Sequence, residues 1–237
     1  MRKFLLLTLA LLCFGALANA DSFTTYATRA QQNPDDFIDW TQLGPDFTIS
    51  GTTIPSPQVV STFNGNLATV GNITGGDFLR VDQGLGWGGS FDNGEALIWT
   101  GNPNFGLGGF GPFSVALQQP VASVGFGIEA DEIAPFTATT WAYDTNGNLL
   151  FTYTINGNPN CGYGAGCEAF VGIGDLSGPN IASVVISTDS GDPFWNNDFA
   201  IDAISTSALA TPEPGSIALL GSGLIGIAGV LRRKLAR

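Results

Sequence analysis

Apolar and polar residues alternate along residues 136–143, and the alternation resumes along residues 149–155 after a short polar break. One side of the second segment carries Leu149, Phe151, Tyr153 and Ile155. A period of two residues is that of a β-strand with two different faces. The break at residues 144–148 contains Asn146-Gly147, a favoured hairpin turn. These residues therefore predict an antiparallel hairpin.

Other short segments show similar strand patterns, separated by turn-forming residues. They lie at residues 59–63, 67–73, 78–81, 95–100, 113–117, 121–129, 169–173, 181–188 and 199–205. The chain has 33 glycines and no long helix-forming stretch in this region, which favours many short strands. About ten strands with several long connections predict an all-β fold, an antiparallel β-sandwich of jelly-roll or Greek-key topology. Residues 35–42 are expected to form a short helix.

The N-terminal segment has the three parts of a secretory signal. Arg2 and Lys3 are basic, an apolar stretch follows at residues 4–17, and Ala18-Asn19-Ala20 forms a small-residue cleavage site. We expect signal peptidase to remove residues 1–20. The alternative is a retained membrane helix, but the apolar stretch is shorter than the roughly 20 residues that span a bilayer.

The C-terminal segment is also tripartite. The motif Pro212-Glu213-Pro214 precedes an uncharged stretch at residues 215–231, and a basic end follows with Arg232, Arg233, Lys234 and Arg237. Seventeen residues at about 1.5 Å each give a helix of about 25 Å, at the short end for a transmembrane helix. The basic residues should stay in the cytoplasm, so the motif should face the outer side of the plasma membrane.

Residues 211–237 resemble the sorting tail of PEP-CTERM proteins, on the strength of Pro212-Glu213-Pro214, the Gly-rich apolar stretch and the Arg-Arg-Lys end. The resemblance implies that an exosortase removes the tail and passes the protein to the cell surface or extracellular matrix. An ordinary C-terminal anchor is the alternative. The strands between residues 121 and 205 also loosely resemble the jelly-roll ectodomains of such proteins.

Residues 21–210 should form one acidic ectodomain. This segment contains 19 of the 20 carboxylates but only Arg29 and Arg80 as basic residues, so its formal charge is −17. Nucleic acid is excluded as a partner because phosphate contacts need Lys and Arg. The hydrophobic fraction of 44% indicates a chain that folds around a core in spite of its charge.

The residue types argue against an enzyme. The chain has no histidine and no serine in a Gly-x-Ser-x-Gly turn, which excludes a catalytic triad. Carboxylate pairs such as Asp92 with Glu95 could in principle flank a glycosidic bond, but carboxylates in turns are commonly structural. Cys161 and Cys167 are predicted to form a local disulfide after export.

Two binding sites are candidates. A calcium site is predicted in the oxygen-rich loop at residues 189–198, with Asp189, Asp192, Asn196 and Asp198 as ligands. A glycan site is predicted from aromatic residues near glycines that could stack on sugar rings: Trp87, Phe91, Phe105, Phe110 and Trp195. The alternatives are that the loop oxygens stabilise turns and that the aromatic side chains belong to the core.

The sequence therefore predicts an exported protein with signal peptidase and an exosortase as processing partners, held in the membrane by its C-terminal helix before processing. The favoured function is a structural or adhesive component of an exopolysaccharide matrix. The alternative is a carbohydrate-binding surface module, and a glycoside hydrolase is the third candidate. No cofactor is expected beyond the calcium ion.

Overall fold

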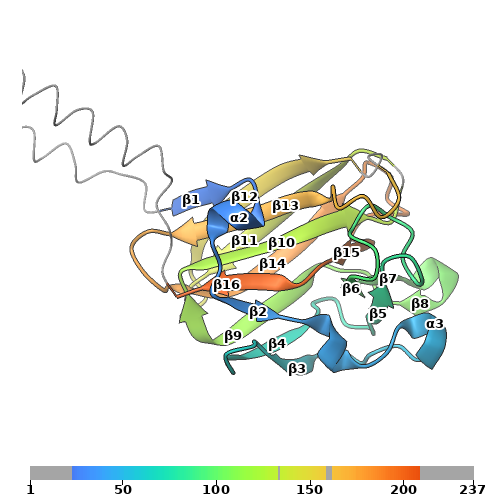
Figure 1. The fold of residues 1–237 in the computed structure, drawn as a ribbon, viewed down its shortest axis with the longest axis horizontal. Helices are drawn as coiled ribbons and strands as arrows, with labels where there is room; N and C mark the ends of the chain where they lie inside the picture. The colour runs from blue at the N-terminus through green and yellow to red at the C-terminus, as the bar shows by residue number, and fades with distance from the viewer. Residues whose placement is uncertain (1–22, 133, 159–161, 209–237) are drawn as a thin grey trace, which may run out of the picture.

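The structure, a computed structural model, describes residues 23–132, 134–158 and 162–208, and it confirms a mostly β fold with antiparallel strands. One sheet has the order β1-β13-β10-β15-β6-β5, with β16 beside β10 and β2 beside β16. Its strands are β1 (Phe23–Tyr26), β2 (Asp36–Ile38), β5 (Leu79–Asp82), β6 (Ala96–Trp99), β10 (Ser123–Ala130), β13 (Ala169–Asp175), β15 (Phe199–Ile201) and β16 (Ile204–Ser207). We call it the front sheet, as it faces the viewer in Figure 1.

A second sheet, the back sheet, has the order β12-β11-β14-β9-β4-β3. Its strands are β3 (Gln58–Ser61), β4 (Leu67–Asn72), β9 (Phe113–Val121), β11 (Phe136–Tyr143), β12 (Leu149–Gly157) and β14 (Ile181–Asp189). The two-stranded hairpin of β7 (Gly101–Asn102) and β8 (Leu107–Gly108) lies at one end of the molecule (Figure 1). Single helical turns form α2 (Arg29–Gln32) and α3 (Phe47–Ser50).

The predicted hairpin is confirmed as β11 and β12, with Thr140 opposite Tyr153. The turn is held by Asp144, whose Oδ1 accepts hydrogen bonds from the backbone N–H groups of Asn146 and Asn148, each at 2.8 Å. Along β11 every second residue, starting at Phe136, is buried. The alternation therefore follows the two faces of this strand, and the face of Phe136 is the inner one.

The main core lies between the two sheets. Phe126 and Ile128 project inward from β10 and belong to the same buried cluster as Val115 and Ile186 of the back sheet. Large apolar side chains that are removed from water on both inner faces hold a two-layer β structure together. The structure thus has the layering of a β-sandwich.

A smaller core covers part of the outer face of the front sheet. Its buried members are Leu79, Val81, Trp87, Phe91, Leu97, Trp99 and Ala200. The segment between β5 and β6 folds back over the sheet and brings Trp87 and Phe91 onto it. As a result, β10 is buried along its whole length, with apolar residues facing the main core and Ser123, two glycines and Glu129 facing the other side.

The first and last strands meet at the same end of the front sheet. Ser207 pairs with Ser123 of β10, and Ser123 pairs with Gly174 of β13, which also pairs with Thr24 of β1. The opposite end of β10 is Ala130, which pairs with Phe199. Figure 1 shows β1 at the left and the β7–β8 hairpin at the right.

The prediction of a helix at residues 35–42 was wrong in its first half. Residues 36–38 form β2, which pairs with β16, and only Trp40–Leu43 is helical, as a 3-10 turn. Ile38 and Trp40, two positions apart, are both completely buried, as expected for alternate residues on one face of an extended segment. The strand predicted at residues 199–205 is interrupted, because β15 ends before Asp202.

Candidate functional site

Three aromatic side chains form a partly exposed cluster, the aromatic platform, at the end of the molecule that carries the β7–β8 hairpin. Phe105 ends a 3-10 turn between β7 and β8, and Phe194 and Trp195 lie in the connection from β14 to β15. The ring centroids are 5.6 Å apart for Phe105 and Phe194, 5.8 Å for Phe105 and Trp195, and 5.0 Å for Phe194 and Trp195. Phe105 is 56% exposed, Phe194 is 40% exposed and Trp195 is half-buried.

A buried carboxyl joins the two segments that carry these rings. Asp198 accepts hydrogen bonds from the Trp99 indole N–H and from Asn102 Nδ2, both at 2.6 Å. The other side-chain group of Asn102, Oδ1, accepts from the Asn104 N–H and so caps the 3-10 turn that ends at Phe105. Burial raises the pKa of Asp198 to about 7, while the hydrogen bond from Trp99 opposes the shift.

The connection that carries Phe194 and Trp195 is organised by its own polar side chains. Asp192 Oδ1 accepts from the Phe194 N–H at 2.9 Å, and the Asp192 carbonyl accepts from the Trp195 N–H at 3.0 Å. Asn197 has a left-handed backbone with a φ of 62°, which asparagine tolerates better than most residues. Its Oδ1 accepts from the Ser187 hydroxyl at 2.6 Å.

The structure does not gather the predicted calcium ligands around one point. Asp189 Oδ1 accepts from the Gly191 N–H, and Asn196 Oδ1 accepts from the Ser190 N–H. Asp192 caps the Phe194 turn, and Asp198 points into the core. Within residues 23–132, 134–158 and 162–208, no group of three or more acidic, His or Cys side chains is placed to hold a metal ion. Asp189, Asp192 and Asn196 thus accept hydrogen bonds within the turns of this loop, and the calcium site stays a prediction.

The predicted glycan residues are divided between the surface and the core. Phe105 and Trp195 come together in the aromatic platform, and Phe110 is half-buried. Trp87 and Phe91 are 5% and 0% exposed, so their assignment to the surface was wrong. Phe194, the third ring of the platform, was not predicted, although its position beside Trp195 in a turn-rich loop was a usable signal.

Trp87 is buried because Glu129 fixes the loop that contains it. The Glu129 carboxylate on the outer face of β10 accepts from the Trp87 indole N–H at 3.0 Å and from the Ser90 hydroxyl and N–H, each at 2.9 Å. Glu129 is 1% exposed. A buried carboxylate that accepts hydrogen bonds from several donors in one loop stabilises that loop.

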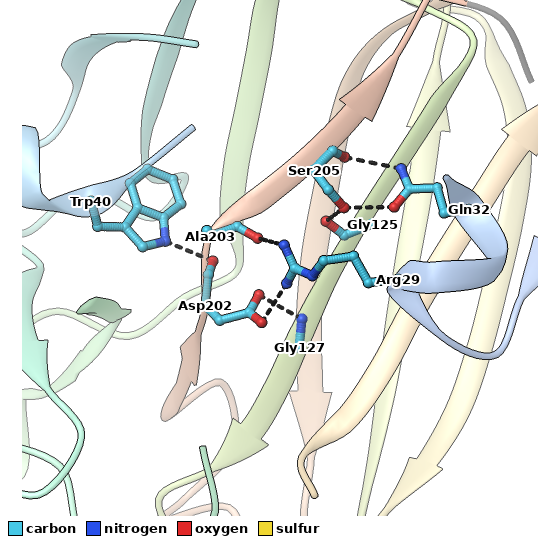
Figure 2. Close-up of polar contacts among 8 residues, drawn as sticks. All are labelled: Arg29, Gln32, Trp40, Gly125, Gly127, Asp202, Ala203 and Ser205. Carbon is cyan, nitrogen blue, oxygen red and sulfur yellow. Dashed lines mark hydrogen bonds and ion pairs between the residues drawn. The ribbon is translucent and has the colours of Figure 1, made fainter. Parts of the chain in front are cut away.

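A polar network ties α2 to the outer face of the front sheet (Figure 2). Arg29 forms an ion pair with the buried Asp202 and donates to the Ala203 carbonyl at 2.9 Å. Asp202 Oδ1 also accepts from the Gly127 N–H at 2.7 Å. One turn further along α2, the buried Gln32 amide donates to the Ser205 carbonyl at 3.1 Å. The network attaches the N-terminal part of the domain to its last strands.

Two half-buried carboxyls lie near this network. Burial, together with the charges of Asp202 and Glu168, raises the pKa of Glu95 to about 7, and burial likewise raises the pKa of Glu168. A Cβ atom at Gly127 would lie 2.5 Å from Glu168 Cγ and 2.8 Å from Asp202 Oδ2. Glycine at position 127 therefore allows two acidic side chains to lie over the same point of β10.

Several predicted features lie outside the described residues. These are the signal peptide, the sorting motif Pro212-Glu213-Pro214, the C-terminal helix with its basic end, and Cys161. The predicted disulfide to Cys167 therefore stays a prediction. Cys167 itself lies beside the loop over the front sheet, and its N–H donates to the Ser90 carbonyl at 3.1 Å. Among the described residues, no helix is long and apolar enough to span a bilayer.

Comparisons with solved structures give weak likenesses. A DUF4465 family protein from Bacteroides caccae ATCC 43185 is 12% identical, with a TM-score of 0.44; the alignment covers 73% of this chain and 100% of that protein. The enzymatically active domain of bacteriophage CBA120 tailspike protein 4 is 14% identical, with a TM-score of 0.27, over 61% of this chain and 18% of the tailspike chain. Neither likeness carries a functional argument. No curated protein sequence matches the chain.

The C-terminal segment gives a specific match. Residues 210–234 match the PEP-CTERM protein-sorting motif, which covers Pro212-Glu213-Pro214, the apolar stretch and the first three basic residues after it. The motif implies an exosortase as the processing partner and the cell surface as the destination. The chain thus carries the sorting motif of PEP-CTERM proteins at residues 210–234.

Proposed function

We propose that the protein is a non-catalytic structural or adhesive component of an exopolysaccharide matrix at the cell surface. The observation that supports this proposal most is the sorting motif at residues 210–234. The folded domain is also suited to an extracellular matrix, because its high net charge favours solubility and discourages self-association. We interpret the sandwich as jelly-roll-like, since the chain crosses between the sheets from β9 to β10 and again from β10 to β11.

Three buried carboxyl groups already accept hydrogen bonds or form an ion pair within the protein, which supports a non-catalytic role. A glycosidase needs one carboxylic acid and one carboxylate facing a common cleft. Glu129, Asp198 and Asp202 are instead buried and bound by indole, amide, guanidinium or backbone donors. These contacts make them structural groups that position loops. We infer that these three carboxyls are not the catalytic pair of a glycosidase, and that the domain has a binding or structural role.

Replacement of Pro212, Glu213 and Pro214 by alanine tests the sorting step. We expect the variant to accumulate in the membrane fraction with its tail uncut, whereas the wild-type protein appears shortened at the cell surface. Leu209→Ala serves as a matched control next to the motif. Mass spectrometry of both fractions measures tail removal. Normal shortening of the triple-alanine variant would contradict the proposal.

A carbohydrate-binding surface module is the second candidate, and the aromatic platform is the observation that favours it. Exposed aromatic rings that contact one another on the protein surface are a recurring feature of binding sites. Each ring offers a large apolar face, and an aromatic side chain has few rotatable bonds, so it loses little conformational entropy when a ligand stacks on it. The two candidate functions are compatible, since a matrix component can be retained by the polysaccharide around it.

A further inference from the structure

We propose that the aromatic platform of Phe105, Phe194 and Trp195 binds a neutral polysaccharide, one or two sugar rings at a time, at the end of the domain opposite to its two termini. The proposal rests on the carbohydrate-binding candidate function and adds the site, the charge class of the ligand and the orientation of the site.

The size of the platform fits a small ligand surface. With Phe105 56% exposed, Phe194 40% exposed and Trp195 half-buried, the three side chains offer about 250 Å² if each exposes 150–250 Å² when free. A stable dimer interface needs about 800 Å² per partner. By themselves the three rings therefore expose less area than a dimer interface needs, but enough for the apolar faces of one or two pyranose rings.

The charge of the domain selects against acidic polysaccharides. Within the described residues, both basic side chains form ion pairs, Arg29 with Asp202 and Arg80 with Asp82. No lysine occurs between residues 21 and 210. An approaching uronate chain would meet a surface of its own sign and no unpaired arginine. A neutral chain carries no such penalty.

The platform is held in place before any ligand arrives. The hydrogen bond from Asn102 to Asp198 links the two segments, and the Asn197 carbonyl accepts from both the Thr100 hydroxyl at 2.8 Å and the Gly111 N–H at 3.1 Å. Ring contacts between Phe105 and the other two side chains span the same junction. A fixed site loses less conformational entropy on binding than a mobile one.

The platform also faces away from the attachment point. The last strand ends at Ser207, opposite Ser123 at the start of β10, whereas Phe199, which follows the platform, pairs with Ala130 at the other end. Seven residues of strand at about 3.3 Å each separate these ends by about 23 Å. A domain whose C-terminal side is held at the membrane would thus present the rings to the surrounding matrix.

Affinity electrophoresis of the mature protein recovered from the cell surface tests the proposal. The gels contain either a β-1,4-glucan, an α-1,6-glucan, a polyuronate, or the neutral and acidic fractions of the exopolysaccharide from the producing cells. We expect retardation by a neutral polymer, with the dissociation constant raised about tenfold in Phe105→Ala and again in Trp195→Ala. Phe63→Ala, which removes a ring that is 91% exposed on the β3–β4 turn, should bind as the wild type does.

Three results would overturn the proposal: no retardation by any neutral polymer, retardation by the acidic polymers alone, or equal binding by Phe105→Ala and the wild type. Circular dichroism confirms that each variant is folded, and Phe194→Ala replaces any variant that is not. Concentration-dependent dimerisation that Phe105→Ala abolishes would indicate a second copy as the occupant. A protein that is sorted normally but does not bind would refute only this inference and leave the surface location intact.

Discussion

Replacement of Arg29 by methionine should strongly destabilise the domain. Arg29 is the partner of Asp202, whose side chain is only 3% exposed. It also lies between the rings of Phe37 and Phe170, at 5.9 and 5.7 Å from their centroids. Methionine keeps much of the apolar contact but removes the charge, so a buried carboxylate is left without its counter-ion.

Removal of one partner of a buried ion pair costs about 3–5 kcal/mol. For a domain of this size, 1 kcal/mol corresponds to about 2–4 °C, so the melting temperature of Arg29→Met should fall by about 10 °C. Chemical denaturation at pH 8 measures the free energy directly. Arg80→Met is the matched control, and it should cost less, because Asp82 is 24% exposed and can be solvated by water.

A double-mutant cycle separates charge from packing. Arg29→Met combined with Asp202→Asn should recover a large part of the loss, since asparagine leaves no buried charge and can still accept from the Gly127 N–H. Burial raises the pKa of Asp202, so acidification should neutralise the carboxyl and reduce the cost of Arg29→Met. A cost below about 1 kcal/mol for Arg29→Met, or no recovery of stability on adding Asp202→Asn, would show that the buried ion pair is not the source of the effect.

Three further results are expected. Asp198 has a folded pKa of about 7, above its unfolded value, so the stability that this carboxyl contributes is present at low pH and is lost as the pH rises through 7. Its share of the fall in unfolding free energy from pH 5 to pH 8 should be roughly 2 kcal/mol, and Asp198→Asn should remove that share while the contribution of Glu95, whose pKa is also about 7, remains. Cys161→Ser should lower the unfolding free energy by about 2 kcal/mol if the predicted disulfide to Cys167 forms, whereas an unchanged value would argue against it. EDTA should leave the melting temperature unchanged, because the Asp192 and Asn196 oxygens already cap turns, and a drop would restore the calcium prediction.

The sequence predicted the strands whose two faces differ in polarity. The β11–β12 hairpin is the best example, since an Asn-Gly turn joins two segments in which large apolar and polar residues alternate. The first two strands, β1 and β2, were not predicted because they are short. β2 is three residues long and lies beside β16, about 170 positions later in the chain, so no local pattern specifies its partner.

The sequence alone did not show which of the aromatic side chains in the loops are exposed and which are buried. Trp87 and Trp195 both stand beside turn residues, yet Trp87 is buried because Glu129, 42 positions later, accepts its indole N–H. That contact depends on how the segment between β5 and β6 folds over the front sheet. In the acidic loop at residues 189–198, the side chains of Asp189, Asp192 and Asn196 accept hydrogen bonds from local N–H groups, so the calcium site stays a prediction.

The central claim is that a sorted, acidic sandwich is retained in the matrix by its aromatic platform. The most direct test compares wild-type protein with the Phe105→Ala, Trp195→Ala double variant in producing cells and measures the share of each that remains with the exopolysaccharide after washing. Both proteins should reach the surface with their tails removed, and the double variant should be released into the medium while the wild type is retained. Equal retention of the two proteins would contradict this claim.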